Sequence, residues 1–138
     1  MGQAQGVTDL GTFTYRSKTF ENGRKIAQVS GSLSLLNIDG TLIYTLVDRN
    51  TTFVAYVYPD GRYRIKIINK KTRRGDGRTG TWRYQNPYRI VTAAKNHRGN
   101  FLYRDRFGFP SGPSGYARFM LTINLRKGVH QEIYATQR

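Results

Sequence analysis

The sequence predicts an all-β fold, an antiparallel meander of about 8–10 strands, from three observations. β-branched and aromatic residues recur in short runs, many runs alternate apolar with polar residues, and turn dipeptides separate them. No window combines end caps with the i, i+3, i+4, i+7 apolar spacing that an amphipathic helix requires. The expected strands are Thr12–Phe20, Ile26–Leu36, Leu42–Asp48, Phe53–Tyr58, Arg62–Ile68, Gly80–Tyr84, Tyr88–Ala93, Asn100–Phe107, Tyr116–Leu125 and His130–Ala135.

Alternation is clearest in two of these segments. Between positions 62 and 67, cations and apolar residues alternate strictly, so the two kinds of side chain face opposite sides of the strand. Between positions 117 and 125, every odd position is apolar, which predicts that Phe119 and Leu121 belong to the core. We therefore expect alanine at either position to cost about 2–5 kcal/mol of stability.

Hairpin turns are predicted at four Asn-Gly or Asp-Gly dipeptides. Type I′ turns require positive φ at both central residues, which Asn, Asp and Gly tolerate. The dipeptides are Asn22-Gly23, Asp39-Gly40, Asp60-Gly61 and Asp76-Gly77. The last lies within the basic segment 69–79, which we expect to be a loop, as is the Gly/Pro-rich segment 109–115.

The edges of such a meander need partners, because an open sheet exposes unpaired backbone groups at both ends. Either the strands close into an up-and-down barrel, or the sheet pairs between subunits. Both arrangements are compatible with the sequence. The length of 138 residues fits one domain. We place that domain at residues 11–138 and treat residues 1–10 as a candidate disordered segment.

Positive charge is concentrated in one stretch of the chain. The protein carries 23 Lys and Arg residues and 8 Asp and Glu residues, a formal net charge of +15. Between Arg62 and Arg106, fourteen cations and two acids leave +12, so only +3 falls to the rest of the chain. A positive charge of this size in one region predicts a polyanionic partner.

We predict that this stretch contacts nucleic-acid phosphates. Strand alternation puts one row of cations on a sheet face, the basic loop adds a clamp, and a later arginine pair forms a second row. The aromatic residues of the stretch alternate out of phase with the cations, which favours phosphate contact over base stacking. The predicted nucleic-acid-binding residues are Arg62, Arg64, Lys66, Lys70, Lys71, Arg73, Arg74, Arg78, Arg83, Arg104 and Arg106.

Side chains that carry catalysis or hold metals are scarce in the sequence. There is no cysteine, and His97 and His130 do not stand at a metal-ligand spacing. Most acids fall at turns, where backbone geometry accounts for them. Residues 75–80 spell G-x-G-x-x-G, but a strand is expected after them instead of the helix that binds a dinucleotide. We therefore expect no catalytic residue, no metal and no cofactor.

The leading hypothesis is a non-enzymatic, nucleic-acid-associated structural protein, such as a small viral or phage coat or nucleoprotein subunit. RNA is the expected partner ahead of DNA, with another polyanion as the alternative. We expect a homo-oligomer joined through sheet edges, in the cytoplasm or a virion, because neither a secretory signal nor an apolar run of membrane-spanning length occurs. Two alternatives stay open: a barrel holding a small apolar ligand, and an interaction subunit with an acidic partner.

Overall fold

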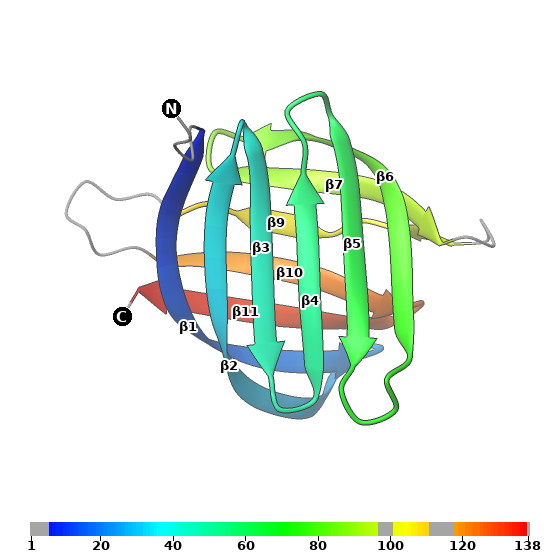
Figure 1. Cartoon of the computed structure of the whole chain (residues 1–138). Helices are drawn as coiled ribbons and strands as arrows, with labels where there is room; N and C mark the ends of the chain where they lie inside the picture. The colour runs from blue at the N-terminus through cyan, green and yellow to red at the C-terminus, as the bar shows by residue number, and fades with distance from the viewer. Residues whose placement is uncertain (1–5, 97–100, 111–117, 138) are drawn as a thin grey trace.

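The chain forms a closed antiparallel β-barrel, which decides between the two predicted arrangements (Figure 1). The computed structural model describes residues 6–96, 101–110 and 118–137. Its strands are β1 (Val7–Glu21), β2 (Arg24–Ile38), β3 (Thr41–Asp48), β4 (Thr51–Val57), β5 (Arg62–Asn69), β6 (Gly75–Asn86), β7 (Arg89–Asn96), β8 (Leu102–Tyr103), β9 (Arg106–Gly108), β10 (Arg118–Arg126) and β11 (Val129–Gln137). In these ranges no helix is long and apolar enough to cross a membrane.

The strands follow one another around the barrel in chain order. From β1 to β7 each strand pairs antiparallel with the next, and β10 and β11 lead back to β1. The short strands β8 and β9 pair with consecutive parts of β7 and share one position, so the ring has ten positions. The pairing of the first strand, β1, with the last, β11, closes it. Because the barrel is closed, the sheet edges that we expected to join subunits are instead paired within one chain.

Two of the predicted turns have the expected geometry. Asn22 and Gly23 have φ of 50° and 84°, and Asp39 and Gly40 have φ of 51° and 90°, as type I′ turns require. At the third site only Gly61 has positive φ, 93°, so that turn is not type I′.

The turn predicted at Asp76-Gly77 is wrong. Both residues lie inside β6, where they pair with Ile67 and Lys66 of β5. The chain turns earlier because the Asn69 side chain organises it: its Oδ1 accepts the N–H groups of Lys71 and Thr72, each at 3.0 Å. An Asx-type cap of this kind replaces the backbone geometry that a glycine pair would supply.

Strand boundaries differ from the prediction at two further places. β1 begins at Val7, which pairs with Ile38, so residues 7–10 belong to the sheet and not to a disordered segment. The predicted strand Asn100–Phe107 is interrupted between β8 and β9 at Arg104 and Asp105. Most of the predicted 109–115 loop lies outside the described residues, as does His97.

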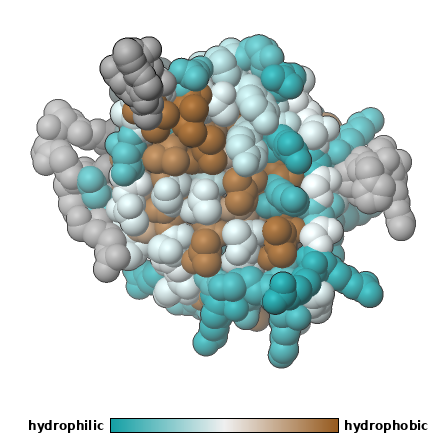
Figure 2. All heavy atoms as spheres, viewed as in Figure 1, coloured by the Kyte–Doolittle hydropathy of each residue, from teal (hydrophilic) through white to brown (hydrophobic). Residues whose placement is uncertain are grey.

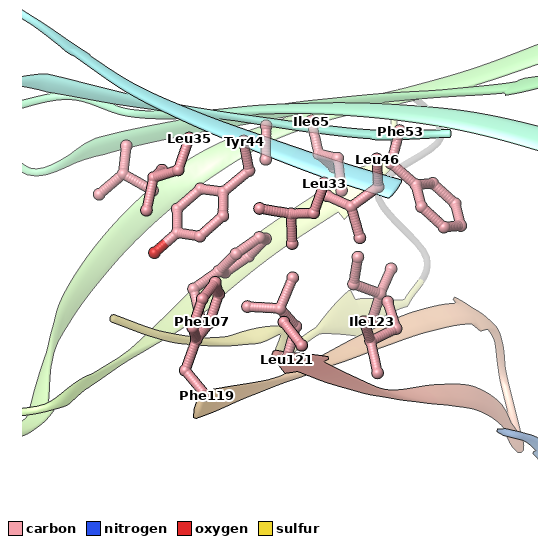
Figure 3. Packing of buried hydrophobic residues seen from close by; sticks show 14 of the residues in the cluster. Leu33, Leu35, Tyr44, Leu46, Phe53, Ile65, Phe107, Phe119, Leu121 and Ile123 are labelled. Atoms are coloured by element: carbon pink, nitrogen blue, oxygen red, sulfur yellow. The ribbon is translucent and has the colours of Figure 1, made fainter. Parts of the chain in front are cut away.

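Apolar side chains from both walls fill the interior of the barrel (Figure 3). The ring of Phe107 lies 4.9 Å from that of Tyr44 and 5.7 Å from that of Tyr63, so three rings occupy the centre. Phe119 and Leu121 are buried as predicted. The alternation read from the sequence therefore identified the inner face of β10 correctly.

The outer face of β2–β5 is mixed in character. Figure 2 shows hydrophobic side chains over its middle and hydrophilic ones gathered along its lower rim, where the β3–β4 and β5–β6 turns lie in Figure 1. The strands β10 and β11 run behind this face, on the far side of the barrel (Figure 1).

Candidate functional site

A groove of about 960 Å³ crosses the outer surface of β2, β1, β11 and β10 and reaches the start of β7; we call it the basic groove. Five of its described lining residues are Lys or Arg, and no described lining residue is Asp or Glu. The cations are Arg16, Lys18, Lys25, Arg89 and Arg118, and the other lining residues are Gln28, Phe119, Met120, Tyr134, Ala135 and Thr136.

The register of the sheet brings these side chains together. Arg16 of β1 is paired with Tyr134 of β11, and Tyr134 is paired in turn with Met120 of β10. Because side chains alternate across a strand, all three point outward while Tyr15 and Leu121 point into the core. One row of outward residues thus runs across three strands.

Arg89 joins this row because β9 places a glycine next to it. Arg89 pairs with Gly108, and Gly108 packs closely against β10. A Cβ at Gly108 would approach the Met120 carbonyl oxygen to 2.8 Å, so no side chain is accommodated there. The space between Met120 and Arg89 stays open, and the groove extends to β7.

The acid beside the groove is already engaged. The Tyr134 hydroxyl donates to Glu132 Oε1 at 2.7 Å, and His130 Nε2 lies 3.2 Å from Glu132 Oε2. The Tyr134 hydrogen bond, followed by that of His130, lowers the pKa of the Glu132 carboxyl. Lys18 Nζ lies 5.9 Å from the centre of the Tyr134 ring. The carboxylate is bonded to Tyr134 and His130 and is also paired across the sheet with Lys18, and Tyr134 remains 40% exposed.

A second basic surface lies on β5; we call Arg62, Arg64 and Lys66 the β5 face. All three side chains are exposed, as the alternation predicted. Arg62 Nε donates to Asp60 Oδ2 at 2.8 Å, and its guanidinium lies 4.6 Å from the centre of the Tyr58 ring. One of the three charges is thus partly neutralised by its own turn.

The β5–β6 turn adds four exposed cations beyond the end of this strand. They are Lys70, Lys71, Arg73 and Arg74. Lys70 Nζ donates to the carbonyl oxygen of Asp48 at 3.1 Å, which ties it to the β3–β4 turn. The structure therefore brings seven of the eleven predicted residues together on and beside β5.

Arg78 is different, because it lies inside the barrel. Its side chain is fully buried and pairs with Asp105 at 3.4 Å, while its Nη2 donates to the Asn124 carbonyl oxygen at 2.6 Å. Its guanidinium carbon lies 3.8 Å from the centre of the Tyr103 ring. Tyr63 completes the cluster by donating to Asp105 Oδ2 at 2.6 Å. Arg78 does not reach the surface at which we predicted phosphate contact.

This cluster was not predicted from the sequence. Burial raises the pKa of Asp105, and the neighbouring Arg78 opposes that shift. The Asp105 carboxylate also accepts the backbone N–H of Asn124 at 2.8 Å. Asp105 and Arg78 are 27 residues apart, and only the barrel geometry brings them together. At this point the Asp105 N–H donates to the Thr92 hydroxyl at 2.9 Å and not to a backbone carbonyl, which accounts for the interruption of the predicted strand.

The three remaining predicted residues form a separate group around β7. Arg83 and Arg106 are both paired with Val91, one from β6 and one from β9. Their side chains flank Val91, which is only 6% exposed although it lies on the outer face. Arg104 is exposed and shares a small hollow with Arg83. These residues belong neither to the basic groove nor to the β5 face.

None of the five groove cations was among the predicted nucleic-acid-binding residues. Only Arg89 comes from the highly charged stretch; the others come from the remainder of the chain, whose net charge is just +3. Alternation in β1 could have placed Arg16 and Lys18 on one face. It could not have shown that β10 and β11 bring further residues beside them.

No family model, curated protein or solved structure matches this chain. Among the described residues, no group of three or more His, Cys, Asp or Glu side chains could hold a metal ion. The function must therefore be inferred from the chemistry of the surfaces themselves.

Proposed function

We propose that the protein is a non-enzymatic nucleic-acid-binding protein that contacts phosphates through the basic groove. The observation that carries this proposal is a groove lined by five cations and by no acid among its described residues. A concave surface of one charge focuses the electrostatic field and concentrates counterions. A polyphosphate that displaces those counterions gains binding free energy from their release.

The extent of the groove favours an elongated ligand. Lys25 lies on β2 and Arg89 on β7, and five strand-to-strand steps separate these strands around the barrel. At about 4.8 Å for each step, the groove crosses about 24 Å of surface. A chain of phosphates can contact cations spread over this length, whereas a small anion can contact only one or two of them.

Two features of the fold narrow the proposal. The rings of Tyr44, Tyr63 and Phe107 occupy the centre of the barrel, which favours binding at the outside over a small apolar ligand held inside. Assembly into a coat or nucleoprotein particle through free sheet edges loses its support, because the barrel is closed. We therefore limit the proposal to binding.

The test is a salt titration of binding. Fluorescence anisotropy is measured with labelled single-stranded RNA and DNA of about 12 nucleotides between about 50 and 200 mM salt. Five phosphate contacts predict a slope of about −3.5 in log affinity against log salt concentration. No binding at the lowest salt, or a slope near zero, would contradict the proposal.

A competition experiment addresses the alternative of an acidic protein partner. Polyglutamate of matched charge is titrated into the complex with labelled RNA. We expect it to displace RNA weakly, because its carboxylates do not reproduce the charge and spacing of phosphates. Displacement at the same charge concentration as unlabelled RNA would favour the acidic-partner alternative instead.

A further inference from the structure

Two smaller hollows extend the basic groove. One, of about 260 Å³, shares Arg89, Arg118 and Met120 with the groove and adds Tyr88. The other, of about 360 Å³, shares Tyr134 with the groove and continues across β1 to β2. The three hollows have walls in common, so they form one continuous track across the outside of the barrel.

Exposed tyrosine rings stand at two points of this track. Tyr88 is 64% exposed, and Tyr134 is 40% exposed. Rings this open to solvent contribute little to the core, but they offer apolar faces on which a planar group can stack. Both have cations close by: Arg89 is next to Tyr88 in sequence, and Lys18 lies beside Tyr134.

Tyr134 and Tyr88 lie several strands apart with cations between them, an order that suits a chain in which bases and phosphates alternate. Tyr134 on β11 and Arg89 on β7 are separated by three strand-to-strand steps, or about 14 Å. Arg118 lies between them on β10 and lines both the basic groove and the hollow that contains Tyr88. A ligand following the track therefore meets a ring, then cations, then a second ring.

We infer that the track binds single-stranded nucleic acid, with bases stacked on Tyr134 and Tyr88 and the intervening phosphates on the groove cations. This inference rests on the proposed function and adds the form of the ligand. A duplex keeps its base faces stacked on one another, so it can use the cations but not the rings. Single strands offer both, and aromatic stacking does not depend strongly on sequence.

The experiment compares three labelled probes with the full chain: a single-stranded oligonucleotide of about 12 nucleotides, its duplex, and an abasic strand with the same phosphates. We expect the intact strand to bind at least about tenfold more tightly than the abasic strand. Y134L and Y88L should each reduce this difference, because each removes one of the two rings on which a base stacks.

Matched variants control for folding and for general effects of tyrosine loss. Y134F keeps the ring and removes only the hydroxyl bonded to Glu132, so it should retain the preference for the intact strand. Y84L replaces another exposed tyrosine, 60% exposed, that does not line the three hollows, and should also retain it. Thermal unfolding of each variant confirms that the barrel is intact.

The outcomes separate this inference from the proposed function. Equal affinity for the intact and abasic strands overturns base stacking, as does an effect of Y134L and Y88L no larger than that of Y84L. The proposed function still stands in either case if binding falls steeply with salt. If none of the probes binds at low salt, both are overturned.

Discussion

The basic groove and the β5 face are both lined by cations, but the groove is built from several strands and the β5 face from one. The cations of the β5 face follow one another along one strand, and further cations stand in the turn after it. This face lies on the side of the barrel seen in Figures 1 and 2. The groove lies across the ring and is assembled from residues 16–28, 89 and 118–136. The contiguous surface is easily found in the sequence, whereas the surface with the more favourable shape for binding is discontinuous.

Shape and local partners favour the groove as the stronger anion site. The cations of the β5 face are exposed to water, where charges are well screened. Arg62 also shares its charge with Asp60. In the groove, cations from several strands line one hollow, and its nearby acid, Glu132, is bonded to Tyr134 and His130 as well as paired across the sheet with Lys18. The predictions below test this ranking.

The largest effect is expected from a cation that belongs to neither surface. R78M should lower the free energy of unfolding by about 3–5 kcal/mol, because it leaves Asp105 buried without its ion-pair partner. Urea denaturation measures the loss, and R64M on the exposed β5 face is the matched control, with a change below about 0.5 kcal/mol. Equal effects of the two substitutions would show that Arg78 is not a structural residue.

The next largest effect should come from neutralising the groove. The combined substitution of Arg16, Lys18 and Lys25 by Gln removes three phosphate contacts, so the salt slope should fall by about 2. At about 0.1 M salt this corresponds to about a hundredfold loss of affinity for single-stranded RNA. Anisotropy titrations measure both quantities. Unchanged affinity and slope would remove the groove from the site.

A smaller effect is expected from the β5 face. Neutralising Arg62, Arg64 and Lys66 together should weaken RNA binding by less than about fivefold while leaving the fold intact, since these cations do not line the groove. The same titrations and a thermal melt measure the two effects. A loss larger than that of the groove variant would reverse the ranking and favour the contiguous surface.

The smallest effect concerns the acid beside the groove. The pKa of Glu132 is lowered in the folded state, so the ionised form stabilises the fold above its unfolded pKa. This contribution disappears as the pH falls through the lower, folded pKa. Y134F removes the larger of the two hydrogen bonds and should raise the pKa of Glu132 toward its usual value. A carboxyl NMR titration measures the shift; an unchanged pKa would show that the Tyr134 hydroxyl does not hold this carboxylate.

Much of the fold could be predicted from local patterns. Period-two alternation identified the inner faces of β5 and β10, and the Asn-Gly and Asp-Gly dipeptides located the β1–β2 and β2–β3 turns. The β5–β6 turn was misplaced because Asp76-Gly77 has the composition of a turn but lies in a strand. There the capping side chain of Asn69, five residues before Arg74, outweighs the dipeptide preference.

The candidate surfaces were predictable only where one segment contains them. The alternation of Arg62, Arg64 and Lys66 with core residues placed these cations outside. The same rule did not predict that Arg78 is buried. This residue lies in a charged segment but on the inward face of β6. An inward cation and an outward cation look alike in sequence until the start of the strand is known.

By itself, the sequence determined that this chain is an all-β meander, which residues of β5 and β10 face the core, and that its charge is strongly positive. Those properties depend on neighbours within a few residues, through side-chain alternation and turn preferences. The tertiary structure alone decided that β1 pairs with β11, that Arg78 meets Asp105, and that Arg16, Arg89 and Arg118 share one groove. These contacts depend on register and closure, which join residues far apart in the chain and leave no local pattern.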